Sequence, residues 1–314
     1  MKKIVCLLAA LAVMICAFSA CGVSENGGGN KLNVVCALFP QYDFVREIAG
    51  EKVNNRLLLP PGTESHAFEP TPSDIISLND ADLFIYIGDN METWAPSVLS
   101  ETDEEKTTVL NIASSLGMRL AEHEHDHEHE KPETEESKDV YDPHIWTDPV
   151  TVKKIVRLIA DTLSELDPDN ASFYNSNADI YIGELEKLDS DIRSVVDNAK
   201  RKEIIFGSRF AIKNFTDEYG LTHLAAFDSC TEETEPSAAA VARIIDEVKE
   251  KNIPVIFYEE LIEPRAASDL AEETGTTALL FHSCHNLSKN DLENGETYLS
   301  LMDKNVENLR IALS

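Results

Sequence analysis

Basic residues are scarce in this chain. Its 314 residues include 27 lysines and arginines against 57 aspartates and glutamates, so the formal net charge is −30. Nucleic acid is excluded as a partner because its phosphates would be repelled by so acidic a surface. A wholly disordered acidic chain is also excluded, since 43% of the residues are hydrophobic. The length suits one large domain or two medium lobes, and the acidity alone predicts only solubility.

Cysteine is sparse as well. Of the six cysteines, two lie in the apolar N-terminal run and Cys21 lies just after it, which leaves Cys36, Cys230 and Cys284. In an exported protein one bridge plus one free thiol is the simplest arrangement, and Cys230 with Cys284 is then the expected pair. Buried free thiols are the other interpretation. The metal-binding pattern C-x-x-C is absent.

The N-terminus has the features of an export signal. A basic start, an apolar run over 4–18 and small residues before Cys21 predict a secretory signal, which is too short to span a membrane. The sequence Phe-Ser-Ala-Cys resembles a bacterial lipobox, so we expect a signal peptide and lipobox at 1–21 and a lipid on Cys21. Residues 22–30 are rich in glycine and predict a flexible tether. The mature protein is therefore expected outside the cytoplasmic membrane, anchored by that lipid.

Short apolar runs alternate with helical periodicity in two stretches of the chain, which predicts parallel βα units in each. In the first stretch we expect strands at 34–39, 56–59 and 83–87, and helices at 42–49 and 72–79. In the second we expect strands at 203–206, 222–226, 254–258 and 278–281, and helices at 210–219, 238–251, 263–274 and 298–313. No sequence repeat relates the two stretches.

A long helical pattern separates them. It runs from 150 to 199 and is broken only at Asp167-Pro168-Asp169. Its second part has about 28 residues, which corresponds to about 42 Å at 1.5 Å per residue. The predicted fold class is α/β, with two lobes that each contain a parallel sheet flanked by helices, joined by one long rigid helix. The expected N-terminal lobe, linking helix and C-terminal lobe are 31–168, 169–200 and 201–314.

Histidines in loops are the candidate metal ligands. Three locations follow predicted strands or lie in turn-rich connections, namely His66, His144 and the pair His282 and His285. Ligand sites in parallel sheets form beyond the carboxyl ends of strands, and imidazole is a common donor to transition metals. Asp142 and Asp148 flank His144 and are candidate acceptors for its second ring nitrogen. The residues by themselves thus indicate an exported two-lobed α/β protein with a candidate metal site.

Two segments carry a family resemblance. Residues 57–74 read Leu-Leu-Leu-Pro-Pro-Gly-Thr-Glu-Ser-His-Ala-Phe-Glu-Pro-Thr-Pro-Ser-Asp, and residues 142–149 read Asp-Pro-His-Ile-Trp-Thr-Asp-Pro. They resemble the first and second ligand segments of the zinc/manganese solute-binding proteins of ABC importers (cluster A-I, TroA-like). Residues 235–237 and 256–260 resemble further segments of that family. The resemblance implies a monomeric two-lobed receptor, not an enzyme, that binds one metal ion between its lobes and delivers it to a membrane permease.

The chain departs from this family at two ligand positions. Arg209 stands where the family has its third histidine, and a guanidinium cannot coordinate a cation. His285 aligns with the fourth ligand, a carboxylate in the family. The resemblance thus implies a site of His66, His144 and His285, with Glu259 beside the ligands. The remaining donor is left open among Cys284, His282, Glu232, Glu235 and water, and a shifted alignment would make His282 or His223 the ligand instead.

The expected metal is Zn²⁺, because nitrogen donors favour zinc, copper and nickel over manganese. Mn²⁺ and those other metals stay as alternatives. An acidic block at 121–139 lies between the two ligand segments, as in zinc-type members of the family. We expect it to be an accessory metal loop, with an insertion of incidental affinity as the alternative. Its histidines are His123, His125, His127 and His129.

Two other classes of function compete with the receptor. Three histidines with an open fourth position could activate water in a zinc hydrolase. Some relatives are labelled surface adhesins, but no residue pattern here indicates adhesion. The receptor is favoured because the segment matches follow receptors, and because no candidate general base lies at helical spacing from a ligand.

Overall fold

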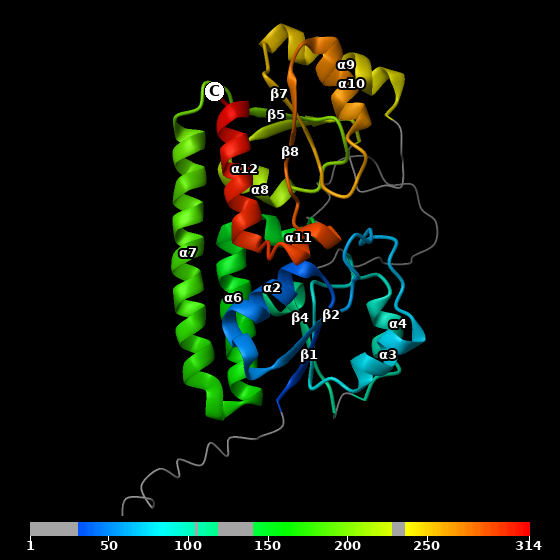
Figure 1. Cartoon of the computed structure of the whole chain (residues 1–314), viewed down its shortest axis with the longest axis vertical. Helices are drawn as coiled ribbons and strands as arrows, with labels where there is room; N and C mark the ends of the chain where they lie inside the picture. The colour runs from blue at the N-terminus through cyan, green and yellow to red at the C-terminus, as the bar shows by residue number, and fades with distance from the viewer. Residues whose placement is uncertain (1–30, 104–105, 119–140, 228–235) are drawn as a thin grey trace, which may run out of the picture. The chain divides into compact units, whose positions relative to one another are not determined.

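Two four-stranded parallel β-sheets form the centre of the structure (Figure 1). This computed structural model describes residues 31–103, 106–118, 141–227 and 236–314. The first sheet contains β1 (Asn33–Cys36), β2 (Asn54–Leu57), β3 (Leu83–Tyr86) and β4 (Thr108–Asn111). The second contains β5 (Glu203–Phe206), β6 (Thr222–Ala225), β7 (Val255–Tyr258) and β8 (Thr277–Leu280). The predicted α/β class with two parallel sheets is confirmed.

Both sheets have the same topology, although the sequence shows no repeat. The strand orders are β2-β1-β3-β4 and β6-β5-β7-β8, and all the paired strands run parallel. In such a sheet the chain reverses its direction of winding between the first and third strands. Ligands bind in loops at the carboxyl ends near that point. Loops after β2, β5, β7 and β8 carry the residues of the candidate site.

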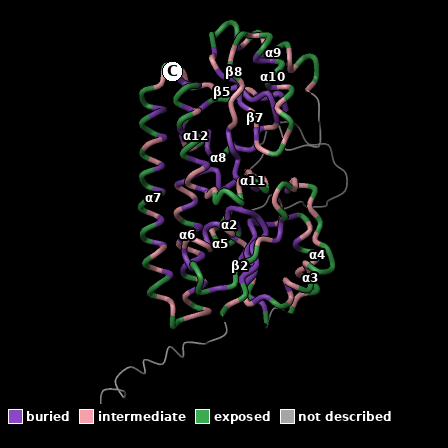
Figure 2. Tube along the Cα trace, in the orientation of Figure 1, coloured by how far each residue is buried: buried purple, intermediate pink, exposed green. Residues whose placement is uncertain are grey.

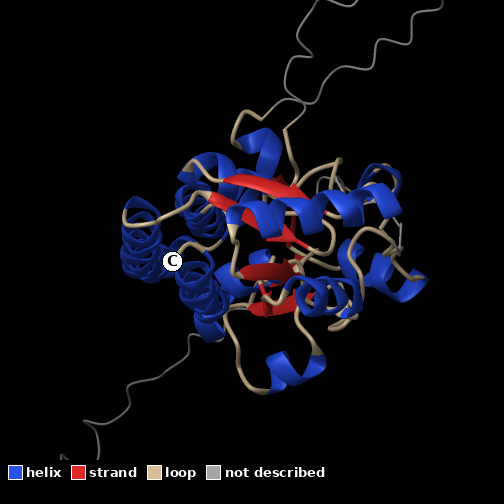
Figure 3. Cartoon of the chain, turned by 90° about the horizontal axis from the view of Figure 1, so that it is seen from above, coloured by secondary structure: helices blue, strands red, loops and turns tan. Residues whose placement is uncertain are grey.

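Helices cover both faces of the sheets (Figure 3). Those of the first half are α2 (Phe39–Ala49), α3 (Pro72–Asn79), α4 (Ala95–Leu99) and α5 (Ile112–Ser115). Those that follow β5 are α8 (Lys213–Tyr219), α9 (Ala238–Lys251), α10 (Arg265–Thr274), α11 (Lys289–Glu293) and α12 (Tyr298–Ala312). Three short 3-10 turns are η1 (Gly50–Lys52), η2 (Ile145–Thr147) and η3 (Pro168–Asn170).

Two long helices connect the halves. α6 (Pro149–Leu166) and α7 (Ala171–Asp197) pack against each other, and Pro168 lies in the short turn between them. α7 has 27 residues and contacts α2 of the first half as well as α8 and α12 of the second. Its buried side chains repeat every three or four residues, from Tyr174 to Val196, so they form one apolar face. The predicted long linking helix is thus present, and it packs against elements of both halves.

One hydrophobic core extends through both halves, and a smaller core lies under α9 and α10 (Figure 2). Strand β5 shows how the cores are divided. Ile204 and Phe206 enter the large core, whereas Ile205 enters the small one, because successive side chains in a strand point to opposite faces. Both faces of β5 are therefore buried, which explains its nearly continuous apolar sequence.

Most expected elements are present, with shifted ends. The strand predicted at 34–39 stops at Cys36, and α2 begins at Phe39 rather than at residue 42. The reason is local: Pro40 is compatible with a first helical turn, and the side chain of Gln41 accepts a hydrogen bond from the Leu38 amide. Strand β4 and the short helices α4, α5 and α11 were not predicted. Each has only four or five residues, too few to show a period.

Several expectations concern the N-terminal segment. The signal peptide at 1–21, the lipid on Cys21 and the tether at 22–30 all lie outside the described residues. Within the part of the chain that the structure describes, no helix is both long and apolar enough to cross a membrane.

Candidate metal centre

His66 lies on the loop that follows β2. The turn Pro60-Pro61-Gly62 precedes it, and Gly62 adopts a φ of 83°, which a glycine tolerates without strain. The Gly62 amide donates to the Leu287 carbonyl (2.7 Å), so this loop is joined to the segment that carries His285. Burial, reinforced by the neighbouring His144, lowers the pKa of His66 to about 4. The ring is therefore neutral at pH 7, as a metal ligand must be.

His144 is oriented by a carboxylate. Its Nδ1 lies 2.8 Å from Asp142 Oδ1, and its backbone amide donates to the same oxygen (2.9 Å). The Asn214 side chain also donates to Asp142, at 3.2 Å. With Nδ1 engaged by Asp142, Nε2 is the ring nitrogen that lies next to His66, 3.4 Å from His66 Nε2. A carboxylate on the far nitrogen orients the ring and increases its basicity as a ligand.

His285 follows β8 and is buried. Its Nδ1 is hydrogen-bonded to the Ser283 hydroxyl, and its Nε2 is buried with no hydrogen-bond partner among the described residues. Its ring centroid lies 4.7 Å from that of His144 and 5.5 Å from that of His66. Burial together with the two neighbouring imidazoles holds its pKa well below the usual range. An unpartnered buried nitrogen normally costs free energy, so this atom indicates a missing ligand.

The three rings form one potential coordination site. One nitrogen from each of His66, His144 and His285 can be chosen such that all three lie within 4.8 Å of one another. At a Zn–N length of about 2.0–2.1 Å, a tetrahedral ion separates two donors by about 3.3–3.4 Å. The His144–His66 distance of 3.4 Å already has this value, and the chosen nitrogen of His285 lies within 4.8 Å of the other two. The donor set therefore fits a tetrahedral transition metal with one position left open.

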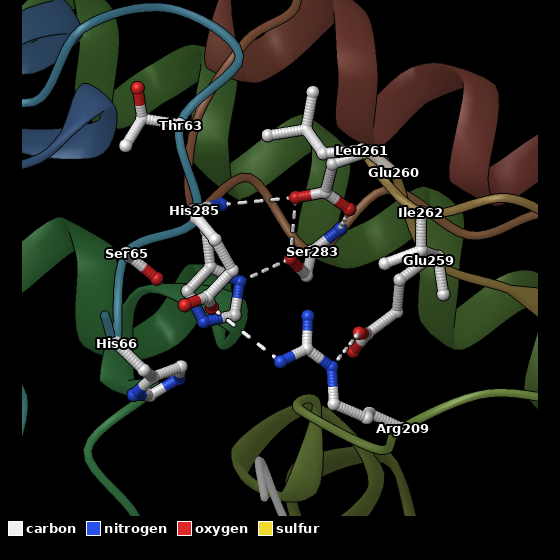
Figure 4. A pocket seen from close by; sticks show the side chains of 11 residues that line it. Thr63, Ser65, His66, Arg209, Glu259, Glu260, Leu261, Ile262, Ser283 and His285 are labelled. Atoms are coloured by element: carbon white, nitrogen blue, oxygen red, sulfur yellow. Dashed lines mark hydrogen bonds and ion pairs between the residues drawn. The ribbon is translucent and has the colours of Figure 1, made fainter. Parts of the chain in front are cut away.

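A cavity of about 40 Å³ lies beside the rings (Figure 4). Arg209, on the loop after β5, points into it with its guanidinium between Glu64 and Glu259. The N···O distances are 3.5 Å to Glu64 and 4.0 Å to Glu259. Burial and the adjacent Glu260 raise the pKa of Glu259 to about 8. The guanidinium thus lies in the cavity beside the rings, and the Glu64 carboxylate partly offsets its charge.

Hydrogen bonds between the two halves hold the ligand loops together. The Asn286 side chain donates to the carbonyls of Pro60 (2.8 Å) and Thr63 (3.0 Å) on the His66 loop. Trp146, two residues after His144, donates from its indole nitrogen to the Ser283 carbonyl (2.9 Å). The segment that carries His285 is thus hydrogen-bonded directly to the His66 loop and to the segment that carries His144. Asn286 and Ser283 were not predicted as site residues, because no local pattern distinguishes them from other polar loop residues.

Some predicted site residues lie elsewhere. Asp148 was expected beside the His144 ring, but both its carboxylate oxygens accept hydrogen bonds from Val150 and Thr151 at the start of α6. That prediction is wrong, because Asp148 is the N-cap of the helix. Of these two aspartates, only Asp142 forms a hydrogen bond with the His144 ring.

His282, Cys284 and His223 are not part of the three-histidine cluster. The Nδ1 of His282 accepts a hydrogen bond from the Cys284 amide (3.0 Å). Cys284 is a buried free thiol whose pKa is raised well above the usual range by burial, so it resists forming the thiolate that binds metals. Its expected disulfide partner, Cys230, lies outside the described residues. His223 is on β6 and stacks on Phe210, with ring centroids 3.6 Å apart.

Other candidates fall in segments that the structure does not describe. Glu232 and Glu235, two alternatives for the fourth donor, are among them. So is the acidic block at 121–139 with His123, His125, His127 and His129.

Two α/β halves joined by a long helix, with imidazoles from both meeting between them, define a metal-binding protein of the solute-receptor type. The chain belongs to the ZnuA family, the periplasmic component A of zinc-uptake complexes, whose sequence pattern matches residues 34–312. This membership confirms the resemblance seen in the sequence.

Individual relatives agree with this assignment. The chain is 33% identical over 300 residues to the high-affinity zinc uptake system protein ZnuA of Bacillus subtilis strain 168, covering 94% of this chain and 93% of that protein. It is 34% identical over 312 residues to the zinc-binding lipoprotein AdcA of Streptococcus pneumoniae R6, covering 99% of this chain but only 61% of AdcA. The Zn(II)-bound ZnuA-like domain of S. pneumoniae AdcA superposes with a TM-score of 0.75 at 32% identity, covering 90% of this chain and 99% of the domain.

Proposed function

We propose that this protein is an extracytoplasmic receptor that binds Zn²⁺ through His66, His144 and His285. The cluster of three imidazole nitrogens is the observation that carries the proposal. The pKa values of His66 and His285 are lowered, so protons compete weakly with a metal for these two rings at pH 7. The zinc-binding relatives support zinc as the cargo.

Single substitutions test the ligand set. We expect the full chain to bind one Zn²⁺ tightly in a competition titration against a chromophoric chelator. The variants His66→Ala, His144→Ala and His285→Ala should each weaken that binding by at least a hundredfold, because two nitrogens hold the ion much less tightly than three. His223→Gln is the matched control, since His223 lies outside the cluster and its affinity should match the wild type. Tight binding that survives all three alanine variants would show that the metal is held elsewhere.

The donor type also predicts metal selectivity. Nitrogen ligands favour zinc, copper and nickel over manganese, which prefers oxygen donors. In competition experiments Mn²⁺ should fail to displace Zn²⁺ at a large excess. Displacement of Zn²⁺ by equimolar Mn²⁺ would instead assign the cargo to manganese.

The receptor's partner is inferred to be the membrane permease of an ABC importer. Membership of a family of zinc-uptake components supports this role. We propose that the signal peptide is cleaved just before Cys21 and that a lipid on Cys21 anchors the protein, with 22–30 as the tether between the lipid and the folded lobes at 31–168 and 201–314. Metabolic labelling with a fatty-acid analogue should mark the wild type and not Cys21→Ala. We propose that the receptor acts as a monomer and releases the metal ion without changing it chemically.

The acidic block at 121–139 is proposed as an accessory zinc site. Alternating histidines and acids offer several weak donors and no apolar face to bury. Deletion of 122–139 should lower the number of zinc ions bound per chain while leaving the tight site intact. An unchanged stoichiometry would contradict an accessory role.

A further inference from the structure

The three-histidine site lacks a fourth donor, and the cavity beside it contains a cation. The donor atoms that lie within 4.8 Å of one another come from three neutral imidazoles, and no described carboxylate or thiol joins them. A bound Zn²⁺ would therefore have one open position and a charge that its ligands do not offset. Arg209, which lines the adjoining cavity with His66 and His285, adds a second positive charge. Glu64, Glu259 and Glu260 also line this cavity, but none of them joins the histidine cluster, so a small anion between the metal and the guanidinium would contact both positive charges.

The guanidinium of Arg209 retains free hydrogen-bonding capacity. Its contacts with Glu64 (3.5 Å) and Glu259 (4.0 Å) are longer than the about 2.7–2.9 Å of a charge-assisted hydrogen bond. None of the described residues accepts a hydrogen bond from it. Its side chain is 18% exposed, and Figure 4 shows it directed into the pocket toward the His285 ring. Arginine suits this role because its planar fork matches an oxyanion.

The cavity limits the size of such a group. Its volume is about 40 Å³, and one water molecule needs about 10–15 Å³ on this measure. The space therefore accepts a species of a few heavy atoms, such as bicarbonate or a short carboxylate. Larger chelators such as citrate would not fit beside the rings.

We propose that this receptor binds its metal together with a small oxyanion, one oxygen of which completes the coordination while another accepts hydrogen bonds from Arg209. The inference rests on the proposed zinc site and specifies its cargo as a metal–anion pair. Arg209 thereby acts as an anion anchor in the place of a metal ligand. The side chains of Glu64 and Glu259 flank the guanidinium at 3.5 and 4.0 Å.

The test compares zinc affinity with and without the anion. Zinc would be titrated into the full chain at pH 7.5 in perchlorate, which coordinates weakly, and then in acetate or bicarbonate at the same ionic strength. We expect the oxyanions to tighten zinc binding at least tenfold. In Arg209→Met this dependence should disappear, while zinc binding in perchlorate is kept or becomes tighter because a positive charge has been removed. Arg265→Gln, an exposed arginine outside the cavity, should behave as the wild type.

A spectroscopic readout distinguishes coordination from general salt effects. Co²⁺ in place of Zn²⁺ should show visible bands that shift when acetate is added to the wild type and not when it is added to Arg209→Met. Zinc binding that is tight but independent of anions would overturn this inference and leave the proposed function intact. Anion dependence that persists in Arg209→Met would overturn the role of Arg209. Absence of zinc binding in every buffer would instead refute the proposed function itself.

Discussion

Replacing Asn286 by alanine tests whether the two halves hold the metal site in shape before the ion arrives. The Asn286 side chain is fully buried and makes three hydrogen bonds. Two go to the carbonyls of Pro60 and Thr63 on the His66 loop, and its oxygen accepts from the Leu287 amide at 2.8 Å. At about 0.5–1.5 kcal/mol each, their loss should cost about 2–4 kcal/mol of unfolding free energy.

Zinc affinity should fall as well. In the variant the His66 loop loses two of its links to the His285 segment, and the ion must then order the loops as it binds. Each 1.4 kcal/mol of that cost weakens binding about tenfold, so we expect a loss of about tenfold to a hundredfold. Denaturant unfolding of the metal-free protein and a chelator-competition titration measure the two effects separately.

A matched control separates stability from preorganisation. The Asn308 side chain donates one hydrogen bond to the Leu280 carbonyl (2.8 Å) within the second half, away from the His66 loop. Asn308→Ala should lower stability by about 0.5–1.5 kcal/mol and leave zinc affinity unchanged. If Asn286→Ala also leaves zinc affinity unchanged, the loops are held by other contacts and the reasoning is wrong.

Three further predictions concern the ligands. Asp142→Asn should weaken zinc binding about 10–100-fold, because it removes the carboxylate that is hydrogen-bonded to His144. Asp148→Asn should instead lower the free energy of unfolding by about 1 kcal/mol and leave zinc affinity unchanged, because Asp148 caps a helix. Equal zinc affinities in the two variants would refute these separate roles. Because the pKa of His66 is lowered from 6.5 to about 4, its contribution to stability is full above pH 6.5 and is lost as pH falls toward 4. Unfolding of His66→Gln should therefore depend less on pH in that window than unfolding of the wild type, and parallel curves would contradict the shift. A zinc concentration of 100 times the Kd should raise the free energy of unfolding of the wild type by about 2.7 kcal/mol. At the same zinc concentration the free energy of unfolding of His285→Ala should rise far less, and thermal denaturation with and without zinc measures both effects.

Local patterns were enough to predict most elements of the fold. The helix at 72–79 and the strand at 203–206 were predicted at their observed bounds, because capping residues and apolar runs mark their ends. Strand β4 was missed because it is a four-residue edge strand with only two apolar residues, Val109 and Leu110, between Thr108 and Asn111. The start of α2 was misplaced because an apolar stretch continues from the strand into the helix.

Part of the candidate metal site could be predicted from the sequence. His66 and His144 lie in segments whose residues are specific enough to identify a ligand, and the structure brings both rings together with that of His285. The role of Asp148 was mistaken because an aspartate before a proline serves equally as a helix cap, and only the hydrogen bonds decide between the two. Links between distant loops, such as Asn286 to Pro60, leave no trace in sequence spacing.

The sequence by itself was enough to predict two βα halves, a long helix between them and histidines in loops. These follow from composition and periodicity, which act over a few residues. The tertiary structure decided which histidines meet, that Asp142 and not Asp148 orients His144, and that carboxylates from two loops flank Arg209. Such choices depend on how separate segments converge, and convergence is set by packing across the whole chain rather than by any local pattern.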